Sequence, residues 1–310
     1  MAHYSGPVID AHHHLWRAPP GNHAQAHPWL KDKPALTRDF TAADFAADFA
    51  GIDIVATVWI EALARDPEAE LARAEAERRA SEGRIATGLV AHAPLDAPDI
   101  GARLDRLMQC SPALRGVRDI VSSGAGRSSP ARRADLLALP GFHAGLGALE
   151  DRGLSLDLML RPHQMLQAAK LLERRPGLSV AIEHAGDPWD QTAAGLSEWA
   201  QGLRALSEHP ATILKVSALQ CHDPGWTMDS LHRLVTPMTE IFGPERMAWG
   251  SDWPVHDSAC PGPVAFAALC KLTESWAAQA RDSFFKGTAQ RFYRIDLPSL
   301  HVDRAASGQD

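Results

Sequence analysis

The chain of 310 residues lacks several features that define other classes of protein. It has four cysteines, and no two of them lie at the short spacing that binds zinc or supports redox exchange, so we expect reduced thiols. No apolar run reaches the roughly 20 residues that a membrane span requires. The first residues, MAHYS, have neither the basic nor the apolar region of a signal peptide. These absences predict a cytoplasmic protein without a membrane segment.

Blocks of positive charge are also missing. The chain has 31 lysines and arginines against 38 aspartates and glutamates, for a net charge of −7. Nucleic acids and anionic membranes are therefore not expected partners, whereas a small molecule is. With 45% hydrophobic residues, there is material for one large globular domain or two small ones. The sequence leaves open whether the chain forms a homo-oligomer.

Eight short apolar segments recur along the chain, with helical patterns between them. Eight strands close a (β/α)8 barrel, and near-continuous apolar runs are typical of parallel strands covered by helices. We therefore predict an α/β fold, a single (β/α)8 TIM barrel over residues 1–295, with a C-terminal tail at 296–310. The predicted strands are Val8–His12, Ile54–Ile60, Ile85–Ala91, Leu114–Ile120, Leu154–Leu160, Leu178–Glu183, Ala211–Ser217 and Arg246–Gly250.

Several helix boundaries can be predicted from local sequence. Thr41 and Asp44 have the spacing of a capping box. Asp66-Pro67 is a typical helix start, and a further helix is expected over 161–175. Residues 17–38, directly after the first strand, show no regular pattern. Because a long irregular segment in a compact domain is often a binding element, we expect this loop to cover the mouth of the barrel.

Three consecutive histidines end the first predicted strand, in the segment VIDAHHHLW. Since side chains alternate along a strand, His12 and His14 share one face with Asp10, and His13 lies on the other. Two imidazoles aimed at one point are costly to bury without a partner, which indicates a site for a metal ion or a substrate oxygen. A surface histidine cluster without a function is the alternative.

Other polar residues stand at the ends of the remaining strands. In a (β/α)8 barrel, the reacting groups lie at the carboxyl ends of the strands, where all strands meet one mouth. The sequence therefore predicts a site built from a single set of strand-end residues. These are His12, His14, Glu61, His92, Arg118, Asp119, His184, Lys215, Ser217 and Asp252.

The sequence resembles the lactonase branch of the amidohydrolase superfamily. This branch includes sugar-acid lactonases of the L-fuconolactonase and L-rhamnonolactonase kind and pyrone-dicarboxylate lactonase. The matching motifs run from about Asp10 to Tyr293 in the family's order: DAHHHLW, HPWL, LRGVRDI, EHAGDP, LKVSAL, FGPERMAWGSDWPV and FFKGTAQRFY. The resemblance implies a hydrolase that opens a small lactone, either of a sugar acid or of the muconolactone or pyrone type.

The chain departs from the family's motifs at several positions. Glu183 replaces an aspartate, Asp187 a basic residue, Ala218 a glycine and Thr288 an asparagine. The histidine that metal-dependent members carry at the end of strand five is missing, and His163 comes slightly later, at the expected start of the next helix, where its role stays open. These departures weaken the case for a full metal cage. The resemblance implies that some lactonases of this branch work without a tightly bound divalent ion.

The strand-end residues suggest a division of roles in lactone hydrolysis. Asp252 is the predicted general base and acid, with a structural cap as the alternative. His12, His14 and His184, together with Asp252, are predicted ligands of one divalent ion such as Zn²⁺. Without a metal, the same imidazoles would donate hydrogen bonds to the substrate carbonyl oxygen. The sequence leaves both forms open.

Substrate binding is assigned to charged and aromatic side chains. Arg118 and Lys215 are predicted anchors for the oxygens of the substrate, with a buried ion pair to Glu61 or Glu183 as the alternative. Glu61 is assigned to substrate binding, and a ligand role, a brace for a histidine and a simple strand-end charge stay open as alternatives. Trp29 and Trp253 are expected to line the mouth, since sugar rings stack on aromatic faces.

Two other functions remain open from the sequence. A zinc-dependent decarboxylase of the aminocarboxymuconate-semialdehyde type would share the barrel and the opening histidines. The missing strand-five histidine and the tryptophans in both end motifs favour the lactonase. A barrel that binds a small molecule without catalysis is the other alternative. The presence of His12, His14, His184 and Asp252 together argues against it.

Overall fold

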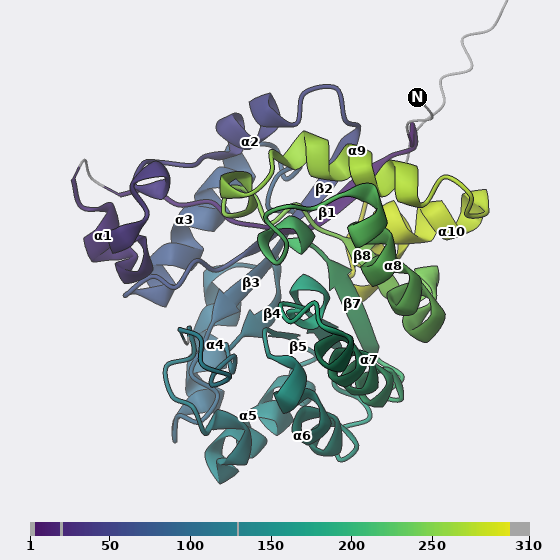
Figure 1. Cartoon of the computed structure of the whole chain (residues 1–310). Helices are drawn as coiled ribbons and strands as arrows, with labels where there is room; N and C mark the ends of the chain where they lie inside the picture. The colour runs from purple at the N-terminus through teal and green to yellow at the C-terminus, as the bar shows by residue number, and fades with distance from the viewer. Residues whose placement is uncertain (1–3, 19–20, 129, 298–310) are drawn as a thin grey trace, which may run out of the picture.

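A computed structural model describes residues 4–18, 21–128 and 130–297 of the chain. Its centre is one sheet of eight parallel strands in sequence order, which confirms the predicted barrel (Figure 1). Backbone bonds from Asp252 N to His12 O and from His14 N to Trp253 O join the last strand to the first. The strands are β1 Val8–His13, β2 Ile54–Ile60, β3 Gly88–His92, β4 Leu114–Arg118, β5 Ser155–Leu158, β6 Val180–Ile182, β7 Thr212–Val216 and β8 Met247–Trp249.

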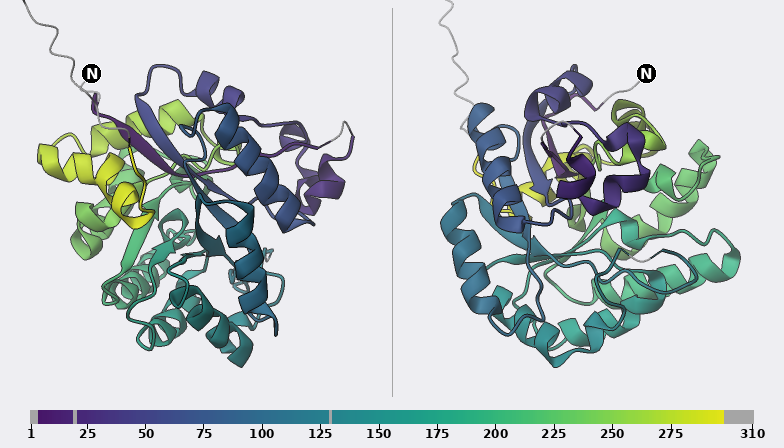
Figure 2. Two further views of the ribbon diagram at one scale, coloured as in Figure 1. Left: turned by 180° about the vertical axis from the view of Figure 1, so that it is seen from behind. Right: turned by 90° about the vertical axis from the view of Figure 1, so that its left-hand side faces the viewer.

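The helices form a layer outside the strands, as the two further views show (Figure 2). Among the described residues, none of them is both long and apolar enough to cross a membrane. The helices are α1 His23–Ala26, α2 Ala42–Asp48, α3 Pro67–Ala80, α4 Ile100–Cys110, α5 Pro140–Glu150, α6 Pro162–Leu172, α7 Ala193–Ser207, α8 Met228–Phe242, α9 Gly262–Leu272, α10 Ala278–Asp282 and α11 Thr288–Phe292.

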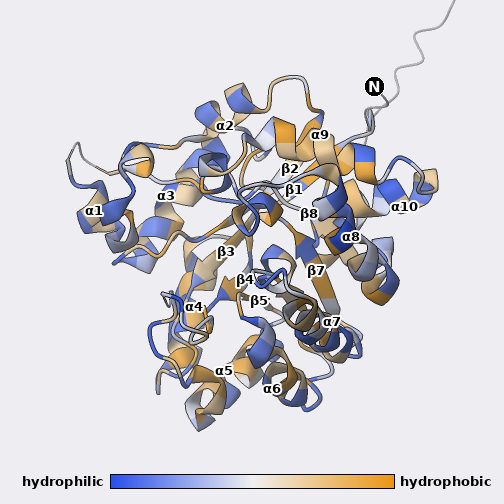
Figure 3. Ribbon diagram, in the orientation of Figure 1, coloured by the Kyte–Doolittle hydropathy of each residue, from blue (hydrophilic) through white to orange (hydrophobic). Residues whose placement is uncertain are grey.

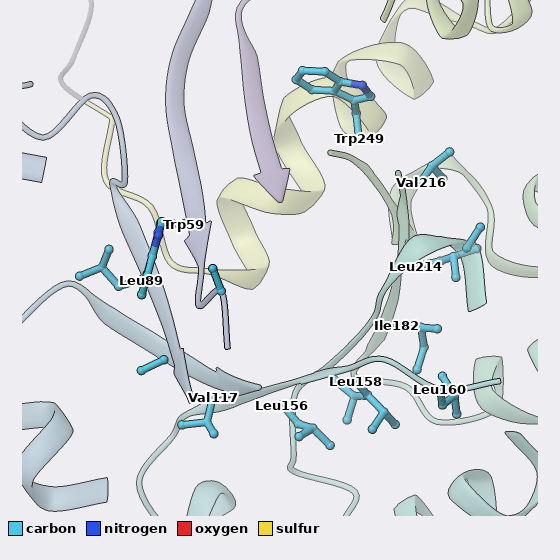
Figure 4. Packing of buried hydrophobic residues seen from close by; sticks show 14 of the residues in the cluster. Trp59, Leu89, Val117, Leu156, Leu158, Leu160, Ile182, Leu214, Val216 and Trp249 are labelled. Carbon is cyan, nitrogen blue, oxygen red and sulfur yellow. The ribbon is translucent and has the colours of Figure 1, made fainter. Parts of the chain in front are cut away.

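The core has two layers because most strands are apolar on both faces, although β5 turns Ser155 and Asp157 inward. Side chains such as Trp59, Val117 and Leu214 point away from the barrel axis toward the helices (Figure 4). Their neighbours in the strands therefore point inward. The inward set forms a second cluster, which Tyr293 near the C-terminus also joins. Hydrophobic residues run along strands such as β3 and β7, whereas the outer helices mix hydrophobic and hydrophilic residues (Figure 3).

The predicted helix starts are confirmed in atomic detail. Thr41 Oγ1 accepts a hydrogen bond from Asp44 N at 3.2 Å, and Asp44 Oδ2 accepts one from Thr41 N at 2.9 Å. Asp66 Oδ1 accepts from Ala69 N at the start of α3. Several strand starts were predicted one to three residues too early, and the largest difference is in β3, which was predicted to start at Ile85. The strand begins at Gly88 because Ala86 has a φ of 56°, a left-handed conformation that interrupts extended backbone.

The segment after β1 is more regular than the sequence indicated. Its described residues form α1 and two 3₁₀ turns, Pro28–Asp32 and Pro34–Leu36. His27 Nδ1 and Trp29 Nε1 both donate to the carbonyl of Ala62, at 2.8 and 2.7 Å. Ala62 follows the end of β2, so these bonds hold the segment beside the carboxyl ends of the strands.

The contribution of the capping box to the stability of α2 can be tested by mutation. Thr41→Ala removes the hydroxyl acceptor of the Asp44 amide, and we expect a loss of about 1 kcal/mol in unfolding free energy. Urea unfolding followed by circular dichroism measures it. Thr41→Ser keeps the hydroxyl and should retain most of the stability. Equal losses in both variants would show that the methyl group, and not the cap, stabilises this helix.

Candidate functional site

Four predicted residues meet at the carboxyl end of the barrel. His12 and His14 come from β1 and the residue after it, His184 follows β6, and Asp252 follows β8. His13 lies on the opposite side of its strand, where it contacts Thr57 Oγ1 at 2.8 Å. The alternation predicted for the three histidines is therefore correct.

The backbone around this cluster is held in unusual conformations. His184 and Asp252 have φ values of 51° and 55°, in the left-handed region that residues other than glycine seldom adopt. Close approach matters too, since a Cβ at Gly250 would lie 2.8 Å from His12 Cβ. Such conformations cost free energy and tend to occur at functional sites, where the surrounding structure enforces them.

Three of the four side chains are within contact distance of one another. His12 Nε2 lies 3.3 Å from His14 Nε2, and the two nitrogens lie 3.5 and 3.3 Å from Asp252 Oδ1. His184 offers a ligand atom within 4.8 Å of those of His12 and Asp252. All four side chains are buried, with at most 8% exposed surface.

The other ring nitrogens of the histidines face protein groups. His14 Nδ1 donates to the carbonyl of Ile60 at 2.8 Å, and His184 Nδ1 lies 3.0 Å from Ser217 Oγ. His12 Nδ1 lies 3.5 Å from Glu183 Oε1, a buried oxygen without any hydrogen-bond partner in the described structure, and 3.4 Å from Lys215 Nζ. We assign the Nδ1 proton of His12 to Glu183, because Lys215 already pairs with Asp157. The Nε2 lone pairs of His12 and His14 are then left facing the site.

The electrostatics of the cluster match this assignment. Burial first, and then the charge of Lys215, hold the pKa of His12 well below its usual value, so its ring is neutral near pH 7. Burial alone would raise the pKa of Asp252, but the facing rings of His184 and His14 lower it overall. The site thus presents a neutral His12 ring and an ionised Asp252 carboxylate to one volume.

This arrangement fits a divalent metal ion. Two unprotonated ring nitrogens and a carboxylate oxygen 3.3–3.5 Å apart repel one another unless a cation lies between them. Ligands about 2.0–2.1 Å from a tetrahedral zinc ion are about 3.3 Å apart from one another, close to the observed spacing. His12, His184 and Asp252 form the one candidate metal group found among the described residues. His14 lies beside it.

The buried arginine of β4 has a different role from the one the sequence suggested. Arg118 Nε donates to Glu61 Oε1 at 2.5 Å, and Nη1 donates to Glu183 Oε2 at 3.3 Å. Its Nη2 donates to the backbone of Glu61. Arg118 does line the pocket beside the cluster, but all of its nitrogens are committed to protein groups. The alternative of a buried ion pair is the one that the geometry supports.

Three further assignments need correction. Lys215 is fully buried and pairs with Asp157, whose Oδ2 also accepts a hydrogen bond from Tyr293 OH. The Lys215 side chain therefore does not reach the pocket. Glu61 is fully buried and braces Arg118. Trp253 is fully buried, packs edge-to-face on aromatic neighbours and donates to Asp48. None of the three lines the pocket, because each is tied to partners inside the barrel wall.

A cavity of about 450 Å³ opens beside the cluster. Trp29 from the segment after β1 stands in its wall, together with His14, His184 and Asp252. Whether Trp29 binds a ligand stays a prediction. A larger cleft of about 830 Å³ lies at the amino ends of β2–β4 and contains none of the cluster residues. We place the candidate site in the smaller cavity, where the buried polar groups converge.

Several lining residues did not stand out in the sequence. Lys33, Cys221 and His222 line the cavity, as do Arg127 and Pro130 from the long connection after β4. Only a structure brings these loops together, although the Gly- and Ser-rich segment 122–130 offered a signal of a functional loop. His163, by contrast, lies exposed in the first turn of α6, so no histidine follows β5 at the site.

The fold and the cluster together define an α/β barrel with a candidate metal site of histidine and aspartate at the carboxyl ends of its strands. A family model described as amidohydrolase matches residues 9–295, so the chain belongs to the amidohydrolase-2 family of hydrolases. The resemblance seen in the sequence motifs is thereby confirmed.

Relatives with a known name are distant but cover nearly the whole chain. An L-fucono-1,5-lactonase of Burkholderia ambifaria is 28% identical over 304 residues, 94% of this chain and 97% of its own. The structure is similar to a zinc-bound amidohydrolase of Burkholderia multivorans, with a TM-score of 0.81, 24% identity and coverage of 94% and 100%. It is also similar to a putative 2-pyrone-4,6-dicarboxylic acid hydrolase of Pseudomonas putida, with a TM-score of 0.71, 21% identity and coverage of 94% and 98%.

The bracing role of Arg118 can be measured through stability. Arg118→Met leaves two buried carboxylates unpaired, and we expect a loss of about 3–5 kcal/mol at pH 8. Arg103→Met, which breaks an exposed pair with Asp99, is the control and should cost less than about 1 kcal/mol. Urea unfolding midpoints compare the variants.

The same variant should respond to pH in a defined direction. Burial raises the pKa of Glu61, but Arg118, His92 and the Leu63 amide together lower it, so the pair stabilises the fold above the ordinary glutamate pKa and loses this contribution as pH falls. Without Arg118, the largest of the contributions that oppose burial is lost, and Glu61 takes up a proton at higher pH. The cost of Arg118→Met should therefore be smaller at pH 5 than at pH 8. A cost independent of pH would contradict the assigned ion pair.

Proposed function

We propose that this protein hydrolyses a small lactone. The observation that carries the proposal is the convergence of the His12, His14 and His184 rings and the Asp252 carboxylate beside a cavity of about 450 Å³. The relative from Burkholderia ambifaria, named as a lactonase, supports the reaction class. A cavity of this size suits a ring of five or six atoms with one or two substituents.

A divalent ion such as Zn²⁺ would be held by His12, His14, His184 and Asp252 in this proposal. When bound, such an ion lowers the pKa of a water molecule and polarises the substrate carbonyl. The zinc-bound amidohydrolase of Burkholderia multivorans supports the choice of metal. Glu183, Ile60 and Ser217 hold the histidine rings in the orientation that the ligand role needs.

Asp252 is the proposed proton carrier. Its carboxylate is ionised, since the facing imidazoles lower its pKa, and it can therefore take the proton of the attacking water. The water oxygen bonds to the lactone carbonyl carbon, and the bond from that carbon to the ring oxygen then breaks. Asp252 returns the proton to the ring oxygen, which leaves as a hydroxyl group. One carboxylate completes both transfers, and the product is a hydroxy acid.

The reaction class is tested by a screen with a pH indicator. Aldonolactones, muconolactones and pyrone carboxylates each release a proton on ring opening at neutral pH, so hydrolysis acidifies a weakly buffered solution. Acidification that depends on the protein supports the proposal. Release of carbon dioxide without ring opening would instead support a decarboxylase. No reaction with any member of the panel would favour a barrel that only binds its ligand.

Asp252→Asn tests the proton carrier. The amide keeps the size of the carboxylate but cannot accept a proton, so turnover on the best lactone should fall by about 10²–10⁴-fold. The Michaelis constant should change much less. Asp257→Asn, which alters a carboxylate outside the cavity lining, serves as the control and should retain activity. Turnover near the wild-type value in Asp252→Asn would remove this residue from the mechanism.

The metal assignment is tested by elemental analysis. His14→Ala removes one imidazole, and we expect less zinc per chain after equilibration with zinc and gel filtration, together with lower activity. His163→Ala, which removes an exposed histidine away from the cluster, should retain the wild-type zinc content. If the wild-type protein keeps its activity after chelation, with metal shown absent by the same analysis, the histidines act as hydrogen-bond donors instead.

A further inference from the structure

The cavity wall is rich in hydrogen-bond donors and poor in acceptors. It contains three cationic side chains, Lys33, Arg118 and Arg127, against a single carboxylate, that of Asp252, which belongs to the histidine cluster. The Ser258 hydroxyl already donates to Val255 O. The His222 ring, whose pKa burial lowers to about 4, is neutral and offers one acceptor nitrogen. The rings of His14 and His184 also line the wall as part of the histidine cluster, and the remaining residues are mostly apolar.

The three cationic side chains differ in how many hydrogen bonds and ion pairs they already make with protein groups. Every side-chain nitrogen of Arg118 bonds to protein groups. Arg127 Nη1 bonds to both oxygens of Asp187. Lys33 is exposed and makes no ion pair with any residue in the part of the chain that the structure describes. Of the three cations, Lys33 is therefore the one whose charge is not already paired with a carboxylate among the described residues.

The position of Lys33 is fixed by the segment after β1. Its backbone N–H donates to Leu30 O, which closes the 3₁₀ turn that also carries Trp29. Trp29 is tied to Ala62 at the end of β2, and the Lys33 ammonium lies 5.8 Å from the centre of the Trp29 ring. These contacts hold the charge at the mouth of the cavity.

The charge of Lys33 also affects the pKa of the Cys221 thiol, another group in the cavity wall. Burial raises the pKa of the Cys221 thiol to about 12, Asp252 adds to this rise, and the Lys33 ammonium opposes it. Cys221 follows β7, whereas Lys33 follows β1. Both line the same cavity, together with the catalytic candidate Asp252. A molecule seated over the cluster therefore lies within the field of this lysine.

These features distinguish two kinds of lactone. The hydroxyl groups of a sugar lactone each donate as well as accept, and burying several of them without acceptors costs free energy. A carboxylate only accepts, and it gains most from an ammonium group. We propose that the substrate is a compact lactone that carries a carboxylate, and that Lys33 binds this carboxylate and sets the preference. The inference rests on the proposed lactonase function and narrows its substrate class.

The experiment compares a carboxylated lactone with its methyl ester, for example a muconolactone pair. Wild-type protein should prefer the free acid. In Lys33→Met, the ratio of kcat/KM for acid over ester should fall by about 10- to 100-fold, mainly through KM of the acid. Lys33→Arg keeps the charge and should restore most of the ratio. Lys31→Met, an exposed lysine of the same turn outside the cavity lining, should leave the ratio unchanged.

A binding measurement separates this inference from the proposed function. Cyclopentanone-3-carboxylate has no ring oxygen and cannot be opened by hydrolysis, so calorimetry reports its affinity whatever the reaction is. Tight binding of the acid but not of its methyl ester, lost in Lys33→Met, supports Lys33 as the carboxylate-binding residue even if no lactone is hydrolysed, in which case the lactonase function alone fails. Hydrolysis of lactones with an acid-to-ester ratio that Lys33→Met does not change would overturn the inference and leave the lactonase function standing.

Discussion

The carboxylate of Asp10 joins the first and last strands of the barrel, and the candidate site depends on this joint. One of its oxygens accepts from both His12 N and Ser251 N at 2.9 Å, and the other accepts from Ser251 Oγ at 2.5 Å. His12 makes one of these contacts with its own backbone, and Asp252 directly follows Ser251, which makes the others. Asp10 therefore fixes the distance between the candidate metal ligands at the end of β1 and the proposed proton carrier after β8.

Below the cluster, the barrel interior holds charges in matched pairs. Arg118 pairs with Glu61 and Glu183, and Lys215 pairs with Asp157, to which Tyr293 also donates. A buried charge costs folding free energy unless it has a partner of opposite charge. Removing one member of a pair therefore leaves the other buried and unpaired. Glu183 links the two levels, because one oxygen accepts from Arg118 and the other faces His12. The ion pair between Arg118 and Glu183 thus helps to orient the His12 ring.

Local patterns were enough to predict the main elements of the fold. All eight strands were located, because apolar β-branched segments between helix caps are a property of neighbouring residues. The capping box at Thr41 and the start of α3 at Asp66 were predicted for the same reason. The start predicted for β3 was too early because Ala86 has a left-handed backbone conformation. Alanine seldom adopts this conformation, so the sequence pattern does not indicate it.

The sequence by itself determined the type of fold and the candidate catalytic and metal-binding residues, since His12, His14, His184 and Asp252 stand at strand ends and strand ends share one mouth. Only the tertiary structure decided which polar residues face the cavity. Lys215, Glu61 and Trp253 were expected there and are enclosed by their partners, whereas Lys33 lines it unpaired within the described residues. The physical reason is that a side chain's exposure and pairing depend on residues distant in sequence, such as Asp157 for Lys215, which no local pattern specifies.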